Sequence, residues 1–226
     1  MPYQPNDLLS RHFQESGPDL ISKVEEQLNR VSPNSPNIPI YRDMMLTVLR
    51  MAQDDHNRWN AKITLQALRE LLNRGVNARL VFIGSGPLHK KLYDSSRDIP
   101  VTFWGYVANK NLLAQMIASA DISIAPGPIE TFCLAALESL ASGTPVVASN
   151  TSAVGEFLQC KDGNCVGLTA DNNGAAFADS IEKLLSLSSQ DIQMRKRCRT
   201  QAENFPWSKT IFELNALHQP LPIKAA

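Results

Sequence analysis

Residues 128–149 read PIETFCLAALESLASGTPVVAS, the strongest structural signal in the chain. The pattern predicts a loop, a helix that begins near Thr131 and stops at the glycine of SGTP, and a buried strand over residues 144–149. An apolar run at residues 121–126 ends just before this loop. Glu130 therefore lies beyond one strand and before the next helix, where α/β sheets bind ligands.

Two acids, Glu130 and Glu138, flank the start of this predicted helix. Leu134, Leu137 and Ala141 have helical spacing and predict its buried stripe. Glu138 lies beside that stripe, and a carboxylate is rarely buried without a partner. It either packs its stem at the rim with a solvated head, or points into a cleft and binds ligand hydroxyl groups while phosphates rest on the first helix amides. Spacing alone leaves both interpretations open.

Length and composition bound the class of protein. The chain has 226 residues, and Lys plus Arg equals Asp plus Glu at 22 each, so no net charge favours nucleic acid or an anionic membrane as partner. No apolar run approaches the roughly 20 residues of a membrane span, and the first residues lack the features of a signal peptide. Cys160 and Cys165 are expected to be reduced thiols and not a metal clip. We therefore predict a cytoplasmic domain without a metal site.

The chain divides into two parts. Residues 1–40 predict a helical and linker segment punctuated by prolines, and residues 41–226 predict one Rossmann-like domain. The predicted strands are residues 44–51, 79–84, 101–104, 121–125, 144–149 and 166–169. Helical patterns separate these strands, which are almost continuously apolar. We therefore predict an α/β, doubly wound domain with a parallel sheet of about six strands and helices on both faces.

A glycine-rich turn and a cation supply further candidates. Gly84, Ser85 and Gly86 follow a predicted strand, where they would let the backbone approach a ligand just before a helix N-terminus. The alternative is a tight turn with Pro87 at the helix start. Arg50 ends the first core strand and would face the same crevice as the acids.

The run around the two acids resembles a known enzyme family. Glu130 and Glu138 enclose seven residues, as in the E-x7-E segment of retaining glycosyltransferases with the two-domain GT-B architecture, glycosyl transferases group 1. The turn GSGP at residues 84–87 is similar to that family's Gly-x-Gly-Pro turn. The segment FPW at residues 205–207 is similar to the Phe-Ser-Trp segment that opens its last helix. The resemblance spans about residues 44–218 and implies the C-terminal, donor-nucleotide domain.

The resemblance also implies roles for individual residues. Glu138 would hydrogen-bond the ribose hydroxyls, and Glu130 would be the catalytic residue that supports the transferring sugar. Arg50 would neutralise the leaving diphosphate, with Arg58 or Lys62 as the second cation. The other implied donor contacts are Gly84, Ser85, Gly86, Val107, Thr131, Phe132, Cys133 and Leu134.

The resemblance implies the donor-binding half of a hexosyltransferase. Its substrate would be a nucleoside-diphosphate sugar of the UDP or GDP type, used without a cofactor. We expect an isolated chain of this kind to be incomplete and to need an acceptor-domain subunit or a second copy. Two alternatives remain open: a non-catalytic sugar-nucleotide-binding or interaction module from a truncated gene, and, less favoured, a UDP-sugar epimerase.

Overall fold

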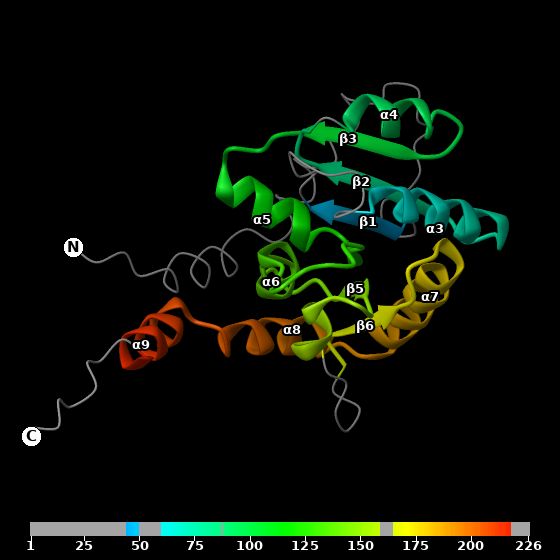
Figure 1. Ribbon diagram of the computed structural model, residues 1–226. Helices are drawn as coiled ribbons and strands as arrows, with labels where there is room; N and C mark the ends of the chain where they lie inside the picture. Colours follow the sequence, from blue (N-terminus) through cyan, green and yellow to red (C-terminus); the bar gives the residue numbers. More distant parts are fainter. Residues whose placement is uncertain (1–43, 50–59, 87, 159–164, 218–226) are drawn as a thin grey trace, which may run out of the picture.

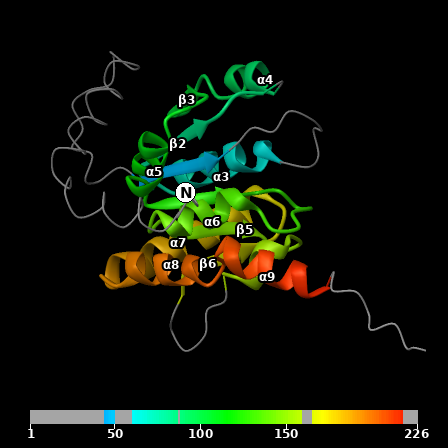
Figure 2. The ribbon, with the colours of Figure 1, turned by 90° about the vertical axis from the view of Figure 1, so that its left-hand side faces the viewer.

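A parallel sheet organises the protein, for which a computed structural model describes residues 44–49, 60–86, 88–158 and 165–217. The sheet has six strands in the order β3-β2-β1-β4-β5-β6, stacked from top to bottom in Figures 1 and 2. The strands are β1 (Met44–Leu49), β2 (Ala78–Ile83), β3 (Val101–Gly105), β4 (Ile122–Ala125), β5 (Val146–Ser149) and β6 (Gly167–Ala170). The predicted doubly wound parallel sheet is confirmed, and its order reverses between β1 and β4.

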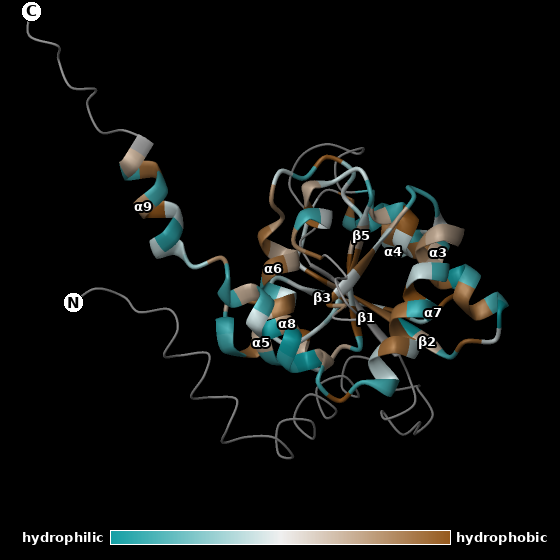
Figure 3. Cartoon of the chain, turned by 90° about the horizontal axis from the view of Figure 1, so that it is seen from below, coloured by the Kyte–Doolittle hydropathy of each residue, from teal (hydrophilic) through white to brown (hydrophobic). Residues whose placement is uncertain are grey.

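Helices cover both faces of the sheet, as predicted. They are α3 (Ala61–Asn73), α4 (His89–Asp94), α5 (Lys110–Ala118), α6 (Leu134–Ala141), the 3₁₀ helix η2 (Ala153–Glu156), α7 (Gly174–Gln190), α8 (Met194–Glu203) and α9 (Trp207–Leu217). Figure 3 places α3, α4 and α7 on one side of the strands and α5, α6 and α8 on the other. Each strand of the interior is therefore enclosed between two helical layers.

The two helical layers explain why β2 is apolar at successive positions. Phe82 faces the α3 layer and packs in the same cluster as Leu68, and both are fully buried. Its neighbour Val81 points to the opposite face and packs with Met116 of α5. Burying each such side chain contributes about 1.5–3 kcal/mol, so both faces of this strand stabilise the fold.

Helices α3 and α7 pack closely and are also joined by exposed ion pairs. Arg74, the residue after α3, donates to Asp179 and Glu182 of α7, at 2.6 Å in each case. Exposed ion pairs of this kind contribute little to stability. At the start of α7, a Cβ added to Gly174 would lie 2.5 Å from the Cβ of Gln66. A larger residue there would push the two helices apart.

The central helix begins later than the sequence predicts. The first helical residue of α6 is Leu134, and Thr131 lies in the preceding loop. Cys133 has a φ of 57°, a left-handed conformation that cannot continue a right-handed helix toward the N-terminus. The expected helix start near Thr131 is therefore wrong by about one turn.

The predicted buried stripe of α6 is also wrong. Leu134 is 43% exposed, and the buried side chains are Ala136, Ser139 and Leu140. These three face the sheet and α8, with which α6 packs. Glu138 is exposed on the same helix, so its head is accessible to a ligand as well as to solvent.

Some predictions concern residues outside the described part of the chain, among them the segment at residues 1–40, Arg50 and Arg58. Cys165 is disulfide-bonded, so the expectation that it is a reduced thiol is wrong. Because disulfides are rare in the cytosol, cysteine usage no longer supports a cytoplasmic location, which stays a prediction. Among the described residues, no helix combines the length and apolar character needed to cross a membrane.

Candidate functional site

A recess lies at the carboxyl end of β4, next to the point where the strand order reverses. Its walls include Ile124 and Ala125 of β4 and Ser139 of α6. Between them runs the acidic loop, residues 126–133, which contributes Glu130 to the wall. The recess measures about 20 Å³, room for about one water molecule, so it is an indentation of this edge and not a cavity that encloses a ligand. Open α/β sheets bind ligands in the crevice at the carboxyl ends of their strands, at the point where the strand order reverses.

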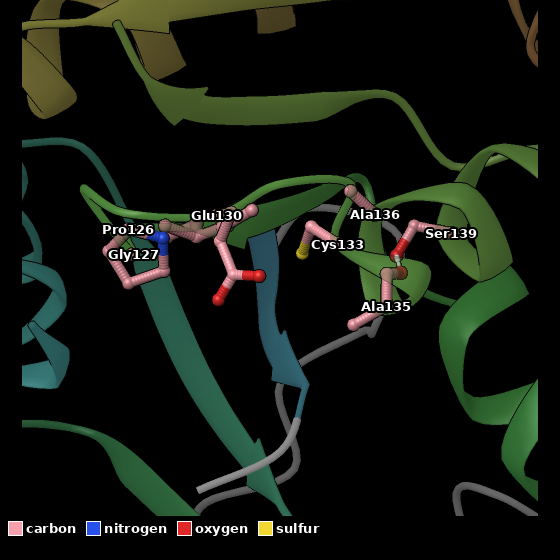
Figure 4. Close-up of a pocket in the computed structure, with 9 residues that line it drawn as sticks. Pro126, Gly127, Glu130, Cys133, Ala135, Ala136 and Ser139 are labelled. Atoms are coloured by element: carbon pink, nitrogen blue, oxygen red, sulfur yellow. Dashed lines mark hydrogen bonds between the residues drawn. The ribbon is translucent and has the colours of Figure 1, made fainter. Parts of the chain in front are cut away.

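The recess brings together Glu130 and Cys133, and the charge of the exposed Glu138 also reaches the Cys133 sulfur. The pKa of the Cys133 thiol is raised to about 11, mainly by burial and also by the negative charges of Glu130 and Glu138, while the amides of Ala135 and Ala136 partly offset these effects. Both carboxylates therefore lie close enough to act on one sulfur atom. In Figure 4 the sulfur points toward the side on which the Glu130 carboxylate lies. The structure thus joins Glu130, Cys133 and Glu138 in one electronegative site.

The glycine turn, residues 84–86, lies at the same edge of the sheet after β2. Gly84 has a φ of 122° and Gly105 a φ of 80°, conformations that favour glycine. The Gly84 N–H donates to the Gly105 carbonyl at 2.7 Å, which links the turns after β2 and β3. Ser85 is exposed, whereas the side chain of Val107 packs against the α5 layer. This half of the edge exposes backbone groups, and the donor contacts expected at these positions stay predictions.

The side chain of Phe132 contacts two other aromatic rings of the protein. Its ring lies 5.6 Å from the ring of Phe157 and 5.8 Å from that of Phe205, measured between centroids. These contacts tie the acidic loop to η2 and to the end of α8. Thr131 and Leu134 on either side are exposed. The ring of Phe132 is 36% exposed, so part of it stays accessible beside these contacts.

The described part of the chain offers few cations and no metal cluster at this edge. Lys62 is exposed in the first turn of α3, while the other two predicted cations lie outside the described residues. The described residues bring together no group of three His, Cys, Asp or Glu side chains that could hold a metal ion.

The turn after β5 contacts the acidic loop and was not selected from the sequence. The Ala153 N–H donates to the Glu130 carbonyl at 2.9 Å, and the Thr151 hydroxyl donates to the Pro128 carbonyl at 2.9 Å. The available signal was the run SNTS at residues 149–152, four polar residues at the end of a buried strand. Such residues hydrogen-bond backbone groups in turns.

Fold and site together define a Rossmann-like domain whose carboxyl edge carries the candidate site. Comparison with protein families then identifies it: the family glycosyl transferases group 1 matches residues 42–187, which is more than half of the chain. The protein belongs to this family, in agreement with the resemblance in its E-x7-E segment.

A curated relative is the GDP-mannose-dependent alpha-(1-6)-phosphatidylinositol dimannoside mannosyltransferase of Mycobacterium tuberculosis, 42% identical over 151 residues. The match covers 66% of this chain and 38% of that protein. The chain therefore spans less than half the length of this relative.

Solved structures agree on the fold. Anabaena Alr3699/HepE in complex with UDP-glucose has a TM-score of 0.68 and 16% identity, and the match covers 89% of this chain and 53% of that one. The C-terminal domain of a glycosyl transferase group 1 family protein (LpcC) from Francisella tularensis has a TM-score of 0.57 and 21% identity, and the match covers 71% of this chain and 85% of that one. The fold is that of a C-terminal GT-B domain.

Proposed function

We propose that this chain is the donor-binding half of a retaining hexosyltransferase and holds a nucleoside-diphosphate sugar at the carboxyl edge of its sheet. One observation carries the proposal: the E-x7-E segment places Glu130 in the recess beside the strand order reversal and Glu138 exposed on the helix that follows. The relative from Mycobacterium tuberculosis is named for GDP-mannose, and the Anabaena structure contains UDP-glucose. These names support a donor of the GDP or UDP type.

In this proposal the two acids have different roles. Glu138 is exposed and accepts hydrogen bonds from the ribose hydroxyls, which gives strong, charge-assisted contacts. Glu130 lies in the acidic loop and supports the transferring sugar. The first amides of α6 face the diphosphate, where the helix dipole favours negative charge. No cofactor is needed for these roles.

Transfer to an acceptor needs groups that would position the acceptor hydroxyl against the sugar. We propose that an acceptor-binding domain supplies them, as a subunit or through a second copy of this chain. Helix α9 supports such a contact, because Trp207 is 63% exposed and Phe212 is 75% exposed. Figures 1 and 3 show this helix extending from the body of the domain.

A thermal-shift panel of UDP-glucose, GDP-mannose and ADP-glucose tests the donor site without an acceptor. A ligand at a hundred times its Kd stabilises the native state by about 2.7 kcal/mol, which raises Tm by several degrees. The Glu138→Gln variant should lose this shift, and Glu203→Gln, an exposed acid of α8, should keep it. No shift with any of the three sugars would contradict the proposal.

The same protein samples separate the two alternatives. Conversion of bound UDP-glucose into its epimer without an acceptor would favour the epimerase. Binding without transfer in the presence of every candidate acceptor domain would favour the non-catalytic module.

A further inference from the structure

A hydrogen-bond network joins the carboxyl ends of β5 and β6 to the acidic loop. The Ser149 hydroxyl donates to the Asn172 side-chain oxygen at 2.7 Å. The Asn172 amide donates to the Thr151 hydroxyl at 3.0 Å, and that hydroxyl donates to the Pro128 carbonyl at 2.9 Å. Three segments that are separate in the sequence therefore meet at the loop that carries Glu130.

The two hydroxyls of the network lie 2.9 Å apart, a contact in which either could donate, and each also has a further acceptor. Each hydroxyl has one proton to donate. When the Ser149 proton goes to Asn172 and the Thr151 proton goes to Pro128, both of these acceptors are satisfied, and the Thr151 N–H donates to the Ser149 oxygen at 3.2 Å. Ser149 is fully buried at the end of β5, so the network is anchored in the sheet. Thr151 is its only member that contacts the acidic loop through a side chain among the described hydrogen bonds.

The acidic loop is held at two carbonyl groups by the same turn. Thr151 holds Pro128, and the backbone N–H of Ala153 holds Glu130 at 2.9 Å. Pro126 and Pro128 each have φ fixed by their rings, which removes further freedom from this part of the loop. With its carbonyl held and its chain stiffened, Glu130 projects its carboxylate from a defined backbone.

We infer that Thr151 is a positioning residue that sets the Glu130 carboxylate through Pro128. The inference rests on the proposed function and deepens it, because it makes the turn after β5 responsible for the sugar end of the donor. Glu138 lies on α6, outside this network, so the nucleotide end is held independently. Loss of the Thr151 hydroxyl should then weaken binding of the sugar nucleotide and spare the nucleoside diphosphate.

Calorimetric titration of the full chain tests this selectivity with two pairs of probes, UDP-glucose with UDP and GDP-mannose with GDP. Thr151→Val keeps the shape of the side chain and removes its hydrogen bonds. We expect about three- to tenfold weaker binding of the sugar nucleotide that the wild type prefers, and a change within about twofold for its nucleoside diphosphate. Thr151→Ser should restore the affinity, and Thr200→Val, at an exposed position of α8, should leave it unchanged.

Hydrogen exchange without ligand gives an independent readout. Thr151→Val should speed exchange at the amides of Gly127 and Ile129, and Thr151→Ser should not. Combined with Glu130→Gln, the Thr151→Val change should add little further loss of sugar-nucleotide affinity, since both act on one group. Unchanged exchange, or equal losses for both members of a probe pair, would overturn the positioning role while leaving the donor function intact. If the wild type bound none of the four probes, the donor function would fail and the inference with it.

Discussion

The glycine turn after β2 and the acidic loop after β4 lie at one edge of the sheet but are built differently. The glycine turn depends on backbone shape, with Gly84 and Gly105 in conformations that favour glycine and joined by one backbone hydrogen bond. The acidic loop depends on side chains, through the Thr151 network and the ring contacts of Phe132. Added atoms should therefore disturb the first region, and deleted polar groups should disturb the second.

The largest effect is expected in the acidic loop, in the alkylation rate of the Cys133 thiol. Because the pKa of Cys133 is raised to about 11, the thiol stays protonated at pH 8, and its alkylation by iodoacetamide should be about a hundredfold slower than that of an ordinary thiol. The rate should rise as pH approaches 11. Peptide mass spectrometry follows the reaction, with the unfolded chain in urea as reference.

Removing the neighbouring charges sharpens this test. Glu130→Gln and Glu138→Gln should each lower the pKa of Cys133 and speed its alkylation at pH 8, whereas Glu203→Gln should not. Alkylation of both Gln variants at the wild-type rate would mean that the acids do not act on this sulfur.

The next largest effect is expected on ligand affinity when the Glu138 carboxylate is deleted. Glu138→Ala should weaken sugar-nucleotide binding about ten- to hundredfold, since hydrogen bonds to a charged group contribute about 1.5–3 kcal/mol. The residue is exposed, so stability without ligand should change by no more than about 0.5 kcal/mol. Titration calorimetry and urea unfolding measure the two effects, and a large fall in stability would indicate a structural acid instead.

The backbone of the glycine region gives a matched pair of variants. Gly105 and Gly75 have φ values of 80° and 79°, and an added Cβ would meet nothing within 4 Å at either position. Gly105→Ala and Gly75→Ala should each lower the free energy of unfolding by about 1–2 kcal/mol. Only Gly105→Ala should weaken ligand binding, because Gly75 lies before β2 at the opposite edge. Equal binding by both variants would remove the first region from the site.

The smallest effect is expected at Phe132. Phe132→Leu should lower stability by about 0.5–1.5 kcal/mol through loss of its ring contacts with Phe157 and Phe205. Binding of the nucleoside diphosphate should stay within about twofold, since the ring packs on the protein. Phe212→Leu on α9, where the ring is 75% exposed, provides the control for stability. A selective loss of binding at Phe132 would assign its side chain to the ligand.

The sheet could be predicted well because each strand is indicated by its own stretch of sequence. The apolar run of β2 and the polar, glycine-containing breaks around it needed no knowledge of distant residues. The start of α6 was missed because Cys133 has a left-handed conformation, which ends the helix there. A cysteine in a sequence does not predict that conformation. Its buried stripe was missed because contacts with α8 and the sheet decide which face is covered.

The site was only half readable from sequence for a related reason. The E-x7-E spacing lies within one segment, so the acids could be predicted together. Thr151 and Asn172 follow different strands and come together only because β5 and β6 are neighbours. The sequence does not show which polar residues after separate strands will form hydrogen bonds with one another.

Hydrogen exchange of the full chain, measured with and without the sugar nucleotide that it binds, tests the central claim most directly. The account predicts slower exchange in both the glycine turn and the acidic loop, with the first turn of α6 included, and no change around Gly75 at the opposite edge. Protection confined to the opposite edge, or protection of neither region under conditions where calorimetry records saturation, would contradict a donor site at the carboxyl end of β4.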